Sequence, residues 1–542
     1  MNEFTYTGKR EGDSAAQRSV AMGQRGMVAS SQSLATLSGY NILAKGGNAV
    51  DAAVAMVSMQ NVVEPHSVGI GGDAFALMYI AKEDKIVGLN ASGRAPYNAS
   101  IQWFKDRGID AFPERGILSV TVPGALCGWA EAIEKYGTMS LGEVFSDAIC
   151  YAENGFPVTE VIAGEWTNQE KLLGSHKSSS ETYLINGKGP RPGQIFRNPD
   201  LARTYRMIAD QGIGAFYEGE ICEDIVKYSE RNNGLLTKKD FQDHKTTWVE
   251  PISLDYRGYT VYELPPNGQG LTALEMLNIL QRYDIAGMGH GSADYLHTLI
   301  ETKKIAFMDR DNFITDPEFE SIPIEKFLSK EYAEKGQQQI DPDRAADPTD
   351  WSKTAPGSET VYVTAVDKDR NAVSFISSIY MHFGSGMVVD GTGIVLQNRG
   401  KSFSLDQNHP NCLMPHKRPM HTIIPAMLFK EGKFLSSFGV MGGDMQPQGH
   451  VQFLTNIIDF KMNIQEAADA PRIRHFEDRD VYVEEGVSSA TVKKLEEKGH
   501  QIQHGKAVVN QVGGAQAIWL DEKENVLLGA SDRRKDGCAI GY

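Results

Sequence analysis

The 542-residue sequence has few cysteines, no long apolar segment and a shortage of basic residues. Its five cysteines are an odd number with no C-x-x-C pair, which argues against a disulfide framework and a structural zinc site. No segment reaches the ~20 apolar residues that a membrane-spanning helix needs. Acidic residues outnumber basic ones by 70 to 54, and the net charge of −16 opposes binding to nucleic acid or to anionic membranes. Because the N-terminus also has no apolar segment, we expect a cytoplasmic protein.

Several well-known catalytic motifs are missing as well. The chain has no G-x-x-x-x-G-K-[ST], no H-E-x-x-H and no G-x-S-x-G, so a P-loop, a zincin site and a nucleophile elbow are unsupported. The turn that begins at Asp367 lacks the later ligands of a calcium loop, and we interpret it as a hairpin turn. His297 and Glu301 lie four residues apart, which suits an ordinary surface pair better than metal ligands. We expect no metal and no organic cofactor.

The composition changes along the chain. A helix is predicted over residues 49–63, capped by Asn48 and ended by Glu64-Pro65, and its apolar residues cover nearly every face, so it should be buried on more than one side. Strands are predicted over 74–80 and 85–90, and helical patterns dominate from about 124 to 335. Residues 336–359 combine prolines and acids with hardly any aliphatic residues, which is the composition of a solvated linker.

Strands and turns make up most of the remaining chain, with few helices expected. Two strong strands, 360–366 and 372–378, flank the Asp367 turn, and further strands are predicted over 387–389, 394–397, 434–440, 481–484 and 515–520. We therefore divide the chain into an N-terminal extension (1–25), a helix-rich part (26–335), a linker (336–359) and a strand-rich part (360–542).

Thr360 opens a strand directly after this linker. Such a linker is a place where backbone cleavage is tolerated. A cut between Glu359 and Thr360 would give Thr360 a free α-amino group, with an ordinary pKa of about 8, beside its own hydroxyl. That amine can act as the general base for the hydroxyl, so one residue would supply both nucleophile and base. A structural threonine at the start of a strand fits the same pattern.

Several motifs follow one another in a particular order. They include Gly46-Gly47-Asn48-Ala49-Val50-Asp51-Ala52-Ala53, Thr121-Val122-Pro123-Gly124, Pro265-Pro266, Asp367-Lys368-Asp369, Phe383-Gly384-Ser385-Gly386, Lys417-Arg418-Pro419, Gly442-Gly443, Ala470-Pro471-Arg472 and Gly529-Ala530-Ser531-Asp532. From about residue 26 to the end, the chain resembles the γ-glutamyltranspeptidase family. The resemblance implies an Ntn-hydrolase: a precursor that cuts itself before a threonine and folds as an α+β, four-layer αββα sandwich of two antiparallel sheets between helical layers.

The resemblance also implies roles for individual residues. Thr360 matches the nucleophile of the family, and Glu359-Thr360 matches the self-cleavage site. Gly442 and Gly443 match the pair whose backbone N–H groups form the oxyanion hole, where the missing side chains let the backbone approach a tetrahedral oxygen. Ser378 stands where the family has a threonine whose hydroxyl contacts the nucleophile.

The substrate-binding positions depart from the transpeptidase pattern. The arginine that holds the glutamyl α-carboxylate is replaced by Ser92, with an arginine at Arg94 instead. The acid that binds the α-amino group is replaced by Ser402, and a neighbouring glutamine by Arg399. The other changed positions are Tyr380, His421 and Thr422. Losing the acid removes the partner of an ammonium group, and a second arginine adds affinity for a carboxylate.

These changes favour an acyl group with a terminal carboxylate and no amine, such as glutaryl, and they resemble the glutaryl-cephalosporin-acylase branch of the family. We expect an amidohydrolase or acyltransferase with a small-molecule γ-glutamyl or glutaryl amide as donor and water or an amine as acceptor. The two fragments should stay associated and could pair into a homodimer of heterodimers. The alternative is an uncleaved, catalytically silent relative that acts as a binding or scaffold protein, which the altered pocket favours.

Overall fold

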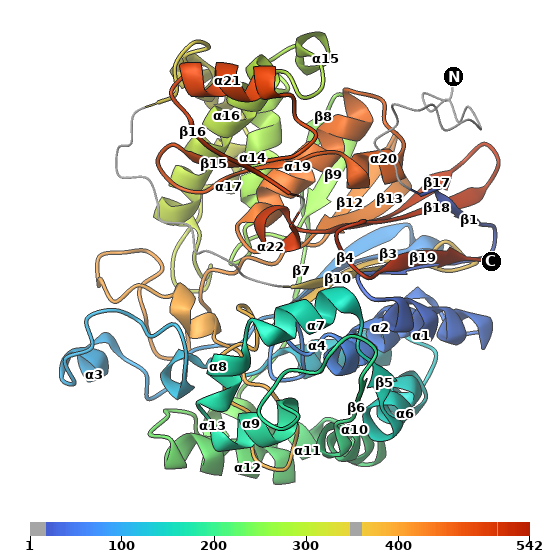
Figure 1. Cartoon of the computed structure of the whole chain (residues 1–542), viewed down its shortest axis with the longest axis vertical. Helices are drawn as coiled ribbons and strands as arrows, with labels where there is room; N and C mark the ends of the chain where they lie inside the picture. Colours follow the sequence, from blue (N-terminus) through green and yellow to red (C-terminus); the bar gives the residue numbers. More distant parts are fainter. Residues whose placement is uncertain (1–17, 347–359, 507) are drawn as a thin grey trace.

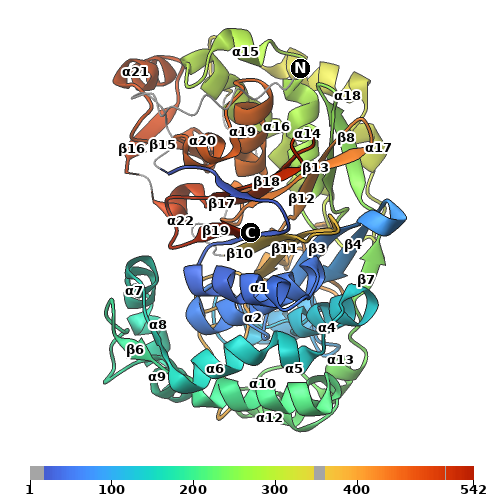
Figure 2. The same ribbon diagram turned by 90° about the vertical axis from the view of Figure 1, so that its right-hand side faces the viewer.

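A computed structural model describes residues 18–346, 360–506 and 508–542. Two seven-stranded sheets lie face to face, with helices on both outer sides (Figure 1, Figure 2). Neighbouring strands within both sheets are antiparallel. The predicted four-layer αββα sandwich is confirmed.

The sheets draw strands from both ends of the chain. The first sheet has the order β1 (Ala21–Gly23), β18 (Val526–Ser531), β17 (Ala515–Asp521), β13 (Lys433–Val440), β12 (Ala426–Lys430), β9 (Tyr259–Glu263) and β8 (Ile252–Tyr256). The second has the order β19 (Cys538–Gly541), β2 (Met27–Ser30), β10 (Val361–Val366), β11 (Ala372–Ser378), β3 (Asp73–Ile80), β4 (Lys85–Ala91) and β7 (Thr247–Val249). Smaller sheets join β14 (Ile473–His475), β15 (Asp480–Glu484) and β16 (Gln501–Gly505), and β5 (Phe156–Pro157) with β6 (Ile195–Phe196).

Each sheet has its own helical cover. The second sheet packs on α1 (Ser33–Ala44), α2 (Ala49–Val63) and α4 (Ala125–Tyr136), and the first on α14 (Gly270–Leu280), α19 (Met445–Ile458) and α20 (Ile464–Asp469), with α16 (Ala293–Phe313) outside α14. The other helices are α3 (Ile101–Lys105), α5 (Leu141–Val144), α6 (Ser146–Asn154), α7 (Glu160–Thr167), α8 (Glu170–Gly174), α9 (Lys177–Tyr183), α10 (Pro199–Gln211), α11 (Gly214–Tyr217), α12 (Glu220–Arg231), α13 (Lys238–Gln242), α15 (Ile285–Met288), α17 (Ile324–Phe327), α18 (Lys330–Gln339), α21 (Ser489–Glu497) and α22 (Val509–Val512). Within the residues described, no helix is long and apolar enough to cross a membrane.

Helix α2 packs against the second sheet and against the helices α1 and α6, and all its residues are buried, as predicted. The Asn48 side chain accepts hydrogen bonds from the first turn, and the Asp51 carboxylate accepts the backbone N–H of Asn48, so a capping box fixes the start of the helix. A carboxylate oxygen of Asp367 also accepts the backbone N–H of Ala49, at 3.0 Å. The predicted hairpin turn between β10 and β11 thus caps a helix more than 300 residues earlier, which ties the helix-rich part of the chain to the strand-rich part.

The structure corrects the predicted boundaries in two places. Strand β1 falls inside the stretch that we assigned to an extension, and it pairs with β18. Helix α18 runs through residues 336–339, which we assigned to the linker, because Gly336 packs closely against Ile279 where a side chain would collide. Most of the predicted linker, with Glu359, lies outside the described residues.

Two predictions for the last third of the chain are wrong. Residues 387–389 and 394–397 form only an isolated bridge between Val388 and Val395 instead of strands. Few helices were expected, yet four follow β13 within the described residues, the longest being α19. Every residue of α19 is buried, so its sequence lacks the one-sided apolar pattern from which a helix is recognised.

Candidate active site

Thr360 lies immediately before β10 and is almost fully buried. The register that pairs Val361 with Ser377 on β11 brings Thr360 opposite Ser378, the last residue of that strand. The Thr360 hydroxyl donates to the Ser378 hydroxyl oxygen at 3.3 Å. The structure therefore brings together the two side chains that the sequence paired as nucleophile and partner.

Gly442 and Gly443 form a turn between β13 and α19, with φ angles of 124° and 59° that favour glycine. Their carbonyls accept the N–H groups of Met445 and Gln446, while their own N–H groups have no hydrogen-bond acceptor among the described residues. The turn also stands at the N-terminus of a 14-residue helix, which favours negative charge. Two unused backbone donors in this position can hold an oxyanion.

Gln446 connects this turn to Thr360. Its Nε2 lies 3.5 Å from the Thr360 hydroxyl oxygen, and its Oε1 accepts the backbone N–H of Ile424 at 2.9 Å. A polar residue in the first turn of a helix after Gly442-Gly443 was the available sequence signal for Gln446, and we missed it.

Arg399 lies on the other side of Ser378, in the short helix η3 (Arg399–Ser402), and is fully buried. Its guanidinium donates to the hydroxyl oxygens of Thr422, at 2.9 Å, and Ser378, at 3.4 Å. It has no carboxylate partner within ion-pair distance among the described residues, and its Nε–H has no acceptor. Burial lowers the pKa of Arg399 to about 10, so it stays positively charged at neutral pH. This buried charge beside the candidate nucleophile is available to a substrate carboxylate.

Tyr380 covers Arg399, whose guanidinium carbon lies 4.0 Å from the centre of the tyrosine ring. The Tyr380 backbone has a φ of 77°, and its N–H donates to the Ser378 hydroxyl oxygen at 2.8 Å. Tyr380 and Ser402 line an open pocket of about 490 Å³ together with Arg310 and Asp444. Arg399 itself does not line this pocket, and the Tyr380 ring lies between the two.

Arg94 does not join this group. Its guanidinium pairs with Asp316 at 3.4 Å and with Glu318 at 2.6 Å, and it donates to the backbone carbonyl of His416. Two acids already neutralise its charge. Of the two candidate arginines, only Arg399 retains an unpaired charge.

His421 and Thr422 are adjacent in sequence but differ in surroundings. His421 faces Asp73 with Nε2 at 3.0 Å from the carboxylate, while its Nδ1 accepts the backbone N–H of Ile423, so the protein uses both ring nitrogens. Burial lowers the pKa of His421 to about 4, and the imidazole is neutral. Thr422 holds Arg399. Because both ring nitrogens of His421 bind protein groups, we assign His421 a supporting role and not a direct contact with substrate.

Gln269 and Arg310, from the helix-rich part of the chain, hold the glycine turn in place. Neither residue was identified from the sequence. The Gln269 amide donates to the carbonyls of Gly443, at 2.9 Å, and Thr422, at 2.7 Å, and accepts from Arg310 at 3.0 Å. Arg310 also pairs with Asp444 at 2.6 Å. These contacts join segments that are far apart in sequence, so no local sequence pattern predicts them.

The sequence matches the family model described as gamma-glutamyltranspeptidase over residues 35–542. The chain belongs to the γ-glutamyltranspeptidase family. It is 41% identical over 526 residues to the "Glutathione hydrolase-like YwrD proenzyme" of Bacillus subtilis (strain 168), covering 96% of this chain and 99% of that protein. It is 34% identical over 540 residues to the "Glutathione hydrolase proenzyme" of Escherichia coli (strain K12), covering 96% and 92%.

The fold agrees with this membership. The crystal structure of the cephalosporin acylase from Bacillus halodurans superimposes with a TM-score of 0.92 at 42% identity, covering 98% of this chain and 99% of that one. The sandwich is the Ntn-hydrolase fold, and the chain is an enzyme of the γ-glutamyltransferase and acylase type. The scaffold alternative finds no support among these relatives. Their names cover different amides, so the donor has to be argued from the site.

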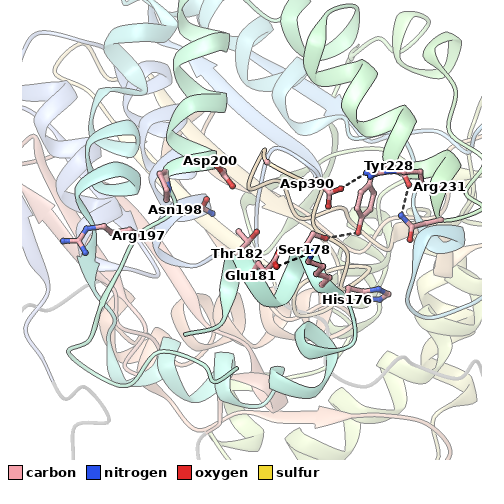
Figure 3. A pocket seen from close by; sticks show the side chains of 14 residues that line it. His176, Ser178, Glu181, Thr182, Arg197, Asn198, Asp200, Tyr228, Arg231 and Asp390 are labelled. Carbon is pink, nitrogen blue, oxygen red and sulfur yellow. Dashed lines mark hydrogen bonds and ion pairs between the residues drawn. The ribbon is translucent and has the colours of Figure 1, made fainter. Parts of the chain in front are cut away.

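A second pocket lies away from the candidate site residues. An open pocket of about 550 Å³ lies between α9, α10 and α12 (Figure 3). Several of its charged residues form ion pairs: Arg231 pairs with Asp390 at 2.6 Å, Lys177 with Glu181 at 3.8 Å, and Asp200 with Arg203 at 2.8 Å. It contains none of the residues described above.

His297 and Glu301 are not the surface pair that we predicted, since both are buried. They point from α16 toward His500, and the ring nitrogens of His297 and His500 lie 2.8 Å apart. Glu301 pairs with the buried Lys304 at 2.7 Å. Lys304 adds a positive charge that disfavours a cation. The cluster links the two parts of the chain.

Proposed function

We propose that this enzyme is a self-processing, N-terminal-threonine amidohydrolase that cleaves amides of acyl groups ending in a carboxylate, and that it accepts glutaryl donors in preference to γ-glutamyl donors. The observation that carries the proposal is Arg399: a buried cation without an ion-pair partner among the described residues, sharing Ser378 with Thr360. Ser402, which replaces an acid, also favours donors without an ammonium group.

Maturation is the first reaction in this proposal. The Thr360 hydroxyl oxygen attacks the carbonyl carbon of Glu359, the peptide C–N bond breaks, and the released Thr360 amine takes the proton. Water then hydrolyses the resulting ester, which leaves a carboxylate on Glu359 and restores the Thr360 hydroxyl. The word "proenzyme" in the names of both relatives above supports such a step.

Turnover repeats this chemistry on a donor amide. The free Thr360 amine accepts the hydroxyl proton as the oxygen attacks, and the N–H groups of Gly442 and Gly443 stabilise the tetrahedral oxyanion. Collapse transfers the proton to the departing amine and leaves an acyl ester on Thr360. Water, or an acceptor amine, releases the acyl group.

Donor preference follows from charge. A γ-glutamyl group carries an ammonium that a glutaryl group lacks. Here that ammonium meets Ser402 in place of a carboxylate and has the Arg399 cation nearby. An unpaired charge in a partly hydrated pocket costs about 1–3 kcal/mol, which corresponds to roughly ten- to hundred-fold in kcat/KM.

The test compares glutaryl and γ-glutamyl p-nitroanilides with the fully cleaved enzyme. We expect the glutaryl substrate to have the higher kcat/KM by roughly ten- to hundred-fold. Equal values would remove the charge argument and return the enzyme to ordinary γ-glutamyl transfer.

A further inference from the structure

The separation of Arg399 and Thr360 limits the length of the acyl chain that can lie between them. The Arg399 Nη2 lies 3.4 Å from the Ser378 hydroxyl oxygen, which is 3.3 Å from the Thr360 hydroxyl oxygen. The two distances, 3.4 and 3.3 Å, add to an upper limit of about 6.7 Å between Nη2 and the oxygen of the nucleophile. Any bend at Ser378 makes the separation shorter.

This distance limit applies to every bidentate contact between the Arg399 guanidinium and a carboxylate. A guanidinium binds both carboxylate oxygens either through Nη1 and Nη2 or through Nε and Nη2. Nη2 takes part in both arrangements. The Nε–H, which has no acceptor in the structure, is available for the second of them.

A donor has to span the same gap. Its carbonyl carbon must come to about 3 Å from the nucleophile, and its carboxylate oxygen to about 2.8 Å from the guanidinium nitrogen. With C–C bonds of about 1.5 Å and attack roughly perpendicular to the plane of the acyl carbonyl, an oxalyl group then spans about 5–6 Å, a malonyl group about 6–7 Å and an extended glutaryl group about 9 Å. Only the shortest acyl groups match the observed limit.

A longer chain could reach Arg399 only by folding back, and the surroundings oppose this. The Tyr380 ring covers one face of the Arg399 guanidinium at 4.0 Å, and Nη1 of the guanidinium donates a hydrogen bond to the Thr422 hydroxyl oxygen. Arg399, Ser378 and Thr360 are all buried, so a folded chain would need space that these side chains occupy.

We propose that the preferred donors are monoamides of short dicarboxylic acids, with two or three carbons in the acyl group. This inference rests on the proposed function, since it needs Thr360 as the nucleophile and Arg399 as the carboxylate-binding group. It concerns donors without an amine, so it leaves the preference for glutaryl over γ-glutamyl as it stands.

The experiment uses oxalyl, malonyl, succinyl and glutaryl p-nitroanilides with the cleaved wild-type enzyme and the cleaved Arg399→Gln variant. For each donor, the ratio of the two kcat/KM values cancels the intrinsic reactivity of the amide. We expect a ratio of about 100 for the oxalyl and malonyl donors and below about 5 for the glutaryl donor. A ratio for glutaryl equal to or above that for malonyl overturns the length limit and leaves the proposed function intact. Ratios near one at every length overturn the proposed function itself.

A second measurement needs no variant and covers the case in which Arg399→Gln does not fold or mature. Free oxalate, malonate, succinate and glutarate are tested as competitive inhibitors of the wild-type enzyme. We expect malonate to inhibit at least about tenfold more tightly than glutarate, since the distance between its two carboxylates matches the separation of Arg399 from the Thr360 hydroxyl. Tighter inhibition by glutarate contradicts the length limit.

Discussion

Exchanging two side chains should reverse the basis of donor selection. The double variant Arg399→Gln with Ser402→Asp removes the cation beside the nucleophile and supplies an acid in the pocket that Ser402 lines. A γ-glutamyl ammonium then gains a counter-ion and loses a like charge. At about 5–6 Å and an effective dielectric constant of about 20, each of these charge interactions amounts to roughly 3 kcal/mol before screening by water. The open pocket reduces the combined effect to about 2–4 kcal/mol.

The assay is the ratio of kcat/KM values for glutaryl and γ-glutamyl p-nitroanilides. We expect the wild-type ratio of roughly 10–100 to fall to about one or below in the double variant. Arg94→Gln is the matched control: it also removes an arginine, but one that is paired with Asp316 and Glu318. It should lower the melting temperature, because the buried Asp316 loses its ion pair with Arg94, and keep the wild-type ratio. An unchanged ratio in the double variant, or a shifted ratio in Arg94→Gln, would refute the reasoning.

Three further predictions concern cleavage and stability. Thr360→Ala should abolish both maturation and turnover, whereas Thr364→Ala, on the same strand face, should still yield two fragments on a denaturing gel; the opposite pattern would move the nucleophile by four residues. Asp367→Ala should lower the free energy of urea unfolding by about 2–4 kcal/mol, because the cap on Ala49 is lost and buried donors are left unpaired; the exposed Asp369→Ala should change it by less than about 0.5. Burial lowers the pKa of His244 to about 3, so the unfolded chain takes up this proton near pH 6.5 and the folded chain only near pH 3, and acid favours unfolding. Between pH 7 and pH 5 the wild type should therefore lose about 2 kcal/mol more than His244→Phe, and parallel losses would contradict this.

The sequence allowed the prediction of elements whose ends carry local signals. The range of α2 agrees residue for residue, because Asn48 starts it and Glu64-Pro65 ends it. Strands β11 and β13 were also recognised from their apolar runs between turns. Helix α19 was missed because burial on all sides erases the pattern that marks a helix.

The candidate site was predictable only in part for a similar reason. Thr360, Ser378 and the two glycines lie at strand ends and turns that leave traces in the sequence. Gln269 and Arg310 reach the glycine turn from more than 130 residues away, and such contacts depend on the packing of whole layers. The two arginines look alike in sequence, and only their partners distinguish the paired Arg94 from the unpaired Arg399.

The central claim is that Thr360 becomes an N-terminal nucleophile, and intact mass spectrometry of the purified protein after incubation tests it most directly. Cleavage before Thr360 predicts fragments of 359 and 183 residues, since 542 − 359 = 183. The smaller fragment should begin with the sequence Thr-Val-Tyr-Val and should gain the mass of one acyl group on Thr360 when a slowly deacylated donor is added. A single species of 542 residues after long incubation, or an acyl group carried by any other residue, would contradict the account.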